Sequence, residues 1–347
     1  MQPYNGGNDP QRGGVYSTGH GFYNPYAEPE WKREKKRIRA AGNGIGLASV
    51  GYVAISFGAV LFLYAAIGVV NALRGGNFME VGENAQWVVT LITYILSLIV
   101  PFGIYALCIQ MPIGAAFPFR KMRGDITVGG IFVGLGAGIV ASYATSYLEQ
   151  ALGLFGIGIS MPELEIPTAL SAKIIYIITM TVAPAFIEEM VFRGIVMQSL
   201  RRFGDMFALV SSALIFGIFH LNLIQTPYAF ILGLCIGYFV MRTGSLWVGV
   251  IMHFLNNSIA TVLTLAEPYC SEEMFLFINL AYSLAAVMCG IIALCLLLVK
   301  YRDMFRFGDA PGVLSSGKRA AYFLTSPALL IAMLTAAVLT AQYIEIL

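Results

Sequence analysis

Residues 184–194 read PAFIEEMVFRG and place two adjacent glutamates and an arginine in a strongly apolar stretch. Ionisable side chains in a hydrocarbon environment are costly and usually functional. Further along the chain His220, His253 and Asn257 interrupt equally apolar segments. A glutamate assisted by a histidine can activate a water molecule, and a histidine with an asparagine can donate hydrogen bonds to a developing oxyanion. These residue types therefore suit hydrolysis by activated water, without a covalent nucleophile.

Helical spacing assigns different faces to these residues. Glu189 and Arg193 are four residues apart, so they share a helix face and are expected to pair. Glu188 points about 100° away around the same helix, which leaves its carboxylate free to act as a base. His253 and Asn257 are also four residues apart and are expected to point together.

Two apolar residues are expected to support this arrangement. Pro184 lies one turn before Glu188, where it removes a backbone hydrogen bond and should kink the helix. The kink would free a carbonyl group and open space for water beside the glutamate. Phe216 lies one turn before His220 and is expected to pack beneath its ring.

The turns between helices predict the depth of the polar residues. Glu188 lies 16 residues before Gly204 and His220 lies 16 residues after it, so both would be roughly 24 Å from that turn. Counted from the next turn on the same side, His253 and Asn257 reach roughly 14 and 20 Å. Antiparallel neighbouring helices would therefore bring all four side chains to a similar level.

The composition places the chain in a membrane. Of the 347 residues, 58% are hydrophobic and only 12% are charged, against about 25% charged in soluble domains. A membrane-spanning helix needs about 20 apolar residues, whereas a β-barrel would show alternating segments of about 10 residues. We predict an all-α polytopic membrane bundle of about eight to nine transmembrane helices, with candidate segments at 44–73, 86–109, 126–148, 169–200, 206–221, 227–241, 245–265, 274–300 and 322–342.

Charge placement predicts the orientation and the organisation of the chain. Residues 1–40 are expected to form a disordered cytoplasmic tail that ends in the basic run WKREKKRIR at 31–39. Basic residues of the later loops fall on the same side, which favours a cytoplasmic N-terminus. The Gly-rich tail and the frequency of such proteins in bacteria favour a multi-pass protein of a bacterial plasma membrane. The membrane-embedded domain would cover 41–347, with the motif-bearing core at about 126–300. Gly130, Gly134 and Gly138 should allow close helix contact.

The polar residues form three motifs in a fixed order, Glu188-Glu189-x-x-x-Arg193 followed by Gly194, then Phe216-x-x-x-His220, then His253-x-x-x-Asn257. This pattern resembles the CAAX protease and bacteriocin-processing family, also called the Abi family, of intramembrane glutamic endopeptidases. The resemblance covers about 184–257. It implies a catalytic base at Glu188, a water-positioning role for His220, an oxyanion site at His253 and Asn257, and structural roles for Glu189 and Arg193.

The sequence therefore predicts an intramembrane endopeptidase that cleaves a membrane-associated or lipidated protein or peptide without a cofactor or metal. Its partners would be that substrate and the lipid bilayer, since no phosphate-binding or nucleic-acid motif is present. Two alternatives remain open at this point. Two histidines and a carboxylate could instead hold zinc, or the chain could be a non-catalytic scaffold or regulator of a signalling or transport partner. A transporter would require a repeated broken helix, which the sequence does not contain.

Overall fold

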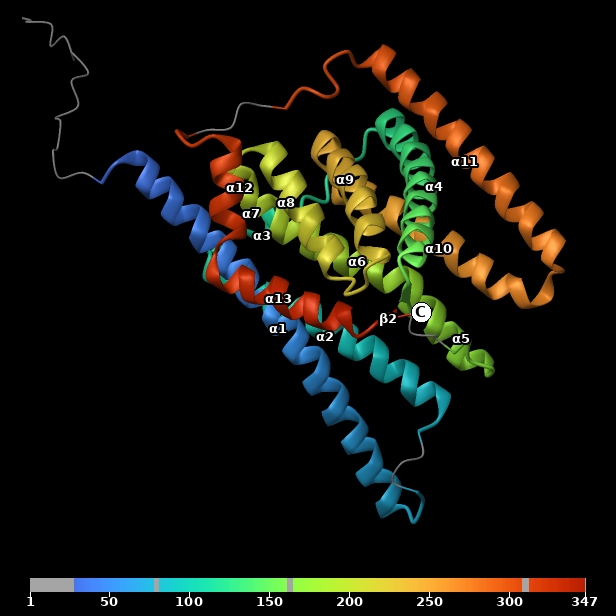
Figure 1. The fold of residues 1–347 in the computed structure, drawn as a ribbon. Helices are drawn as coiled ribbons and strands as arrows, with labels where there is room; N and C mark the ends of the chain where they lie inside the picture. Colours follow the sequence, from blue (N-terminus) through green and yellow to red (C-terminus); the bar gives the residue numbers. More distant parts are fainter. Residues whose placement is uncertain (1–27, 78–80, 161–164, 308–311, 347) are drawn as a thin grey trace, which may run out of the picture.

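The structure is a computed structural model that describes residues 28–77, 81–160, 165–307 and 312–346. Over these ranges the chain is a bundle of α-helices (Figure 1), so the predicted all-α polytopic class is confirmed. Seven helices in the described ranges are long and apolar enough to cross a membrane, namely α1 (Glu30–Leu73), α2 (Glu83–Cys108), α4 (Gly124–Leu154), the continuous helix Leu170–Phe203, α9 (Gln225–Thr243), α10 (Leu246–Ala266) with the short turn Glu267–Tyr269, and α11 (Glu272–Lys300).

The helix Leu170–Phe203 carries the first motif and is called the motif helix below. Two of its segments are π-helical, with wider turns than an α-helix. In chain order its parts are α5 (Leu170–Ile177), η1 (Ile178–Val182, π-helical), α6 (Ala183–Glu188), η2 (Glu189–Val196, π-helical), α7 (Met197–Leu200) and η3 (Arg201–Phe203). Single π-turns inside helices often occur at functional sites, and here one directly precedes Pro184 and the other begins at Glu189.

Two predicted segments differ from the structure. The segment 206–221 corresponds to α8 (Asp205–Ile218), whose 14 residues extend about 21 Å, less than the roughly 30 Å hydrocarbon core. The last segment, 322–342, is broken into α12 (Ser316–Leu324) and α13 (Pro327–Ala341), which meet at 68°. Pro327 explains the break, because the residue before a proline avoids the helical region, and Ser326 is extended with ψ 129°. If that bent pair is one span, the described residues contain eight spans.

The N-terminal helix begins earlier than the sequence predicted. The basic run 31–39, expected at the end of a disordered tail, lies within α1, which starts at Glu30. Residues 1–27 of that predicted tail lie outside the described residues. The later part of α1 exposes large apolar side chains such as Phe57, Leu61 and Leu73, as expected for a helix that faces lipid.

Close helix contacts surround the motif helix. The predicted glycine face of α4 is confirmed, because a Cβ atom at Gly130 would come within 2.7 Å of the Phe239 ring on α9, and one at Gly138 within 2.9 Å of Asn256 on α10. Gly46 of α1 packs directly on the backbone before Leu329 in α13. Figure 1 shows α11 beyond α4 on one side of the bundle and α1 with α2 and α13 on the other.

The remaining elements are short connections. The helix α3 (Ile113–Ala116) lies in the loop between α2 and α4. The strand β1 (Ile157–Ile159) pairs antiparallel with β2 (Ile344–Ile346), with Ile157 opposite Ile346. This pairing attaches the end of the chain to the loop that leads into the motif helix.

Candidate active site

A cavity of about 400 Å³ lies between the motif helix, the end of α8, and α10. Its lining includes all four side chains that were predicted to be catalytic, Glu188, His220, His253 and Asn257. A neighbouring cavity of about 200 Å³ shares Glu188 and His220 with it and also reaches α1 and α2. The four side chains that the depth estimate placed at a similar level therefore line one cavity, and Glu188 lies between two cavities.

The pair predicted between Glu189 and Arg193 is present and fully buried. Arg193 Nη1 lies 2.9 Å from Glu189 Oε1, and the two side chains are 1% and 0% exposed. The guanidinium also lies over the Phe216 ring, 4.2 Å from its centroid, and Nη2 donates to the Gly233 carbonyl over 3.3 Å. A buried ion pair requires such additional partners, because its desolvation cost is otherwise not offset.

His253 connects the two glutamates, which the helix-face argument did not predict. Its Nδ1 lies 2.9 Å from Glu189 Oε1, and its Nε2 lies 3.6 Å from Glu188 Oε2. The first distance is a hydrogen bond in which the ring donates to the carboxylate, whereas the second exceeds the usual hydrogen-bond range. Glu189 thus fixes the orientation of His253 and directs Nε2 towards Glu188.

Glu189 is itself confined by the backbone of α10. A Cβ atom at Gly249 would lie 2.7 Å from Glu189 Oε2, so the carboxylate occupies space that only glycine leaves at this position. Among the described residues, that Oε2 is buried without a hydrogen-bond partner.

Tyr94 of α2 is a residue of the site that the sequence reasoning missed. Its hydroxyl donates to Glu188 Oε1 over 2.7 Å, and its side chain lines both cavities. The other oxygen, Glu188 Oε2, is buried and has no hydrogen-bond partner among the described residues. In the sequence, Tyr94 is a phenol within the apolar segment 86–109. A phenol there indicates a functional residue less strongly than a charged group does, because aromatic residues are common in such segments.

Asn257 contacts the carbonyl group that Pro184 leaves without its helical donor. Proline has no N–H, so Pro184 cannot donate to the carbonyl four residues earlier, which belongs to Met180. Asn257 Nδ2 donates to that carbonyl over 3.3 Å, and its Oδ1 accepts from Asn256 Nδ2 over 3.4 Å. Tyr228, which also lines the cavity, donates to Asn256 Oδ1 over 3.1 Å. Pro184 thus leaves the Met180 carbonyl free to hold the side-chain amide of Asn257 in place.

His220 lies just beyond α8 and not inside a helix as predicted. The helix ends at Ile218, and Leu221 adopts a φ of 50°, a left-handed conformation that stops helical hydrogen bonding. His220 Nδ1 lies 3.0 Å from the Phe216 carbonyl, and the two rings are edge-to-face with centroids 5.0 Å apart. Because a carbonyl only accepts, Nδ1 carries a proton, and in the neutral tautomer Nε2 then has a free lone pair.

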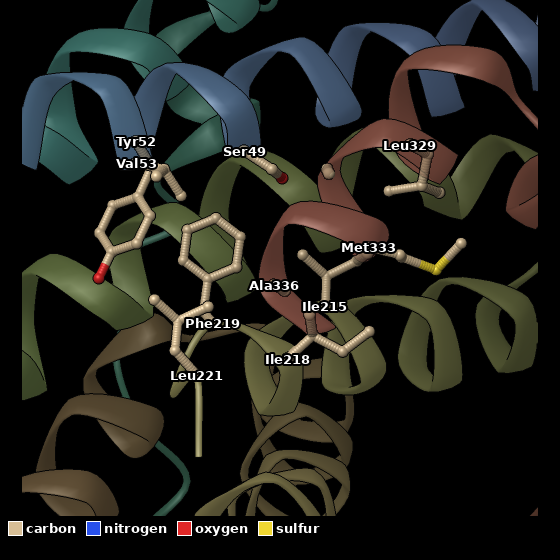
Figure 2. Close-up of a pocket in the computed structure, with 11 residues that line it drawn as sticks. Ser49, Tyr52, Val53, Ile215, Ile218, Phe219, Leu221, Leu329, Met333 and Ala336 are labelled. Atoms are coloured by element: carbon tan, nitrogen blue, oxygen red, sulfur yellow. The ribbon is translucent and has the colours of Figure 1, made fainter. Parts of the chain in front are cut away.

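The side of the site that faces α1 is apolar. Tyr52 of α1 and Phe219 line the smaller cavity with Glu188, and their ring centroids are 4.6 Å apart. Both also line a narrow pocket between α1, α8 and α13, where Figure 2 shows their rings side by side. Glu188 is therefore enclosed on this side by aromatic and aliphatic side chains.

In the described ranges, no group of three or more His, Cys, Asp and Glu side chains is arranged to hold a metal ion. Residues 170–259 match the family model described as type II CAAX prenyl endopeptidase Rce1-like. Neither a curated protein nor a solved structure matches the chain. The matched segment contains the three motifs and both π-helical segments. The resemblance to the CAAX protease and bacteriocin-processing family is confirmed by this match over residues 170–259.

Proposed function

We propose that the chain is an intramembrane endopeptidase in which Glu188 activates a water molecule for attack on a peptide bond. The observation that carries the proposal is the single cavity lined by Glu188, His220, His253 and Asn257, with Glu188 Oε2 lacking a hydrogen-bond partner among the described residues. The family match supports an endopeptidase acting on a lipid-modified substrate at the membrane. The cavity is large enough for water and a short peptide segment.

In the attack step, Glu188 Oε2 accepts one proton of the water molecule while its oxygen bonds to the carbonyl carbon. The free lone pair of His220 Nε2 accepts a hydrogen bond from the same water and so holds it between the two side chains. This arrangement is supported by the shared position of both residues on the two cavities. Positioned general bases of this kind typically contribute 10²–10⁴-fold to the rate.

The carbonyl oxygen becomes an oxyanion as the tetrahedral intermediate forms. In its imidazolium form His253 donates from Nδ1 to Glu189 and presents an Nε2–H to this oxygen, and the Asn257 amide is the second donor. Glu188 then transfers its proton to the nitrogen of the leaving amine as the C–N bond breaks. Glu189 and Arg193 take no part in proton transfer, and they hold His253 through the buried ion pair.

The experiment compares cleavage of a peptide library, including lipidated peptides, by the purified protein and by Glu188→Gln in detergent. Glutamine keeps the shape of the side chain and can still accept from Tyr94, but it cannot accept a proton from water. We expect cleavage to fall by at least 10²-fold, with no effect of a metal chelator. Glu267→Gln, on the turn after α10 and away from the cavity, is the matched control and should cleave like the wild type.

Other outcomes assign the chain to different classes. Loss of wild-type cleavage on addition of the chelator would support a zinc enzyme and contradict the metal-independent mechanism. Absence of cleavage of any peptide by folded wild-type protein would contradict the proposal and favour a scaffold. Unchanged cleavage by Glu188→Gln would remove Glu188 from the role of base.

A further inference from the structure

The basic run of α1 contains six Lys and Arg side chains within residues 31–39. Four of them have side-chain contacts in the structure, Lys36 with Glu28 at 2.8 Å, Lys32 over the Trp31 ring, and Lys35 and Arg39 over the ring of Tyr322 in α12. The contacts of Lys35 and Arg39 attach one face of α1 to α12 and leave Arg33 and Arg37 for a different face.

Arg33 and Arg37 are four residues apart on α1 and line a cavity of about 290 Å³ together with Arg202, at the end of the motif helix. The Arg202 guanidinium lies 4.9 Å from the centroid of the Phe203 ring, beside the same cavity. Among the residues that the structure describes, none of these three guanidinium groups takes part in an ion pair or a hydrogen bond. Three guanidinium groups from two helices, unpaired within the described residues, therefore face one space.

The acidic residues of this cavity do not neutralise the three arginines. Glu34 is committed elsewhere, because its Oε1 accepts from Arg319 Nε over 2.7 Å and its Oε2 accepts from the backbone of Val313 and Leu314. Among the described residues, Glu30 is the other acidic residue of the lining. The cavity thus has an excess of positive charge, and a ligand that completes it should be an anion.

The position of the cavity indicates the source of that anion. Arg33 and Arg37 lie just before α1 becomes continuously apolar, and Arg202 lies at the turn where the motif helix ends. Both residues of α1 and Arg202 therefore lie at or near the end of an apolar candidate span, where a membrane helix meets the lipid phosphates. The planar fork of a guanidinium matches the oxygens of a phosphate group.

We propose that Arg33, Arg37 and Arg202 bind the phosphate group of an anionic phospholipid, which bridges α1 and the motif helix at the membrane surface. Arg202 lies 14 residues beyond Glu188 along the motif helix, or about 21 Å, so the bound lipid takes no part in the chemistry. Its binding is therefore independent of the proposed peptidase activity.

The experiment measures lipid adducts of the intact protein by native mass spectrometry during titration with phosphatidylglycerol, with phosphatidylcholine as the zwitterionic comparison. The test variant carries Arg33→Gln, Arg37→Gln and Arg202→Gln. The control variant carries the same change of charge on exposed basic residues of other loops, Arg120→Gln, Lys121→Gln and Arg302→Gln. Thermal unfolding of all three proteins establishes that each is folded.

We expect one phosphatidylglycerol molecule to bind the wild type and the control in preference to phosphatidylcholine. The test variant should bind it at least roughly tenfold more weakly, since each lost bond to a charged group costs about that factor. A similar loss in the control would overturn the proposal in favour of general charge attraction. Equal binding of both lipids would also overturn it, and so would displacement of the lipid by inorganic phosphate at concentrations equal to those of the lipid.

A folded protein is required for each of these conclusions. If the triple variant does not fold, the pair Arg33→Lys and Arg37→Lys keeps both charges and loses only the fork geometry. Under the proposal it should weaken phosphatidylglycerol binding while leaving the number of positive charges unchanged. Unchanged binding by that folded pair would contradict recognition by the arginine forks.

Discussion

Replacing Tyr94 with phenylalanine removes one oxygen atom and leaves the ring that lines both cavities. The lost group is the hydroxyl that donates to Glu188 Oε1 over 2.7 Å. Hydrogen bonds to charged groups contribute about 1.5–3 kcal/mol. The carboxylate would then rotate away from the geometry in which Oε2 meets the water. Since about 1.36 kcal/mol corresponds to a tenfold change in rate, we expect kcat to fall roughly 10- to 100-fold.

The assay separates positioning from substrate binding. Because Tyr94 acts through Glu188 and not on the substrate, KM should stay within about twofold of the wild type while kcat falls. Tyr176→Phe is the matched control. Tyr176 is also buried and packs edge-to-face on Trp87, but its hydroxyl has no hydrogen-bond partner among the described residues. Its removal should leave both kinetic constants unchanged.

Two results would refute this reasoning. A folded Tyr94→Phe variant with wild-type kcat would mean that the hydrogen bond does not orient the base. An equal loss in Tyr176→Phe would mean that removal of a phenol oxygen acts on the bundle as a whole. Unfolding midpoints in detergent, measured on the same samples, identify any loss that comes from stability.

Three further substitutions test the support of the site. Arg193→Met removes one partner of a buried ion pair and should lower the free energy of unfolding by about 3–5 kcal/mol, as measured by denaturant unfolding. The double variant Glu189→Gln, Arg193→Met should recover part of this loss. Gly249→Ala places a Cβ atom 2.7 Å from Glu189 Oε2 and should reduce the cleavage rate by at least tenfold, because small displacements of catalytic groups are that costly. Gly103→Ala, where a Cβ atom would meet nothing within 4 Å, is its control. Pro184→Ala restores a backbone N–H, which would compete with the Asn257 amide for the Met180 carbonyl. We therefore expect kcat to fall while the unfolding midpoint does not.

The composition of the site was predictable because its charged and polar residues stand out from an apolar background. Each of Glu188, His220, His253 and Asn257 interrupts an apolar segment, and distances counted from the helix turns placed them at a similar level. All four line one cavity in the structure. Helix rise per residue and antiparallel connections between neighbouring helices are enough to predict this level, and both follow from the positions of apolar segments and turns in the sequence.

The contacts within the site were less predictable, because they depend on the positions of individual side-chain atoms and not only on which helix face a residue occupies. Glu189 was assigned to Arg193 alone, yet a carboxylate has room for several donors, and its Oε1 also accepts from His253. The end of α8 before His220 depends on a left-handed Leu221, a conformation that leucine gives no reason to expect. Tyr94 was missed because a phenol in an apolar segment is ordinary until its partner is known.

The geometry also explains why two adjacent glutamates do not act alike. Arg193 compensates the charge of Glu189 at 2.9 Å, whereas in the described ranges Glu188 is approached by a neutral phenol on one oxygen and by His253 at 3.6 Å from the other. Glu189 is therefore the acceptor that orients the imidazole, and in the proposed mechanism Glu188 is the carboxylate that takes the proton from water. The phenol comes from α2, outside the segment 170–259 that matches the family model. In the proposed mechanism the matched segment would thus supply the reacting groups, and a helix outside it would set the orientation of the base.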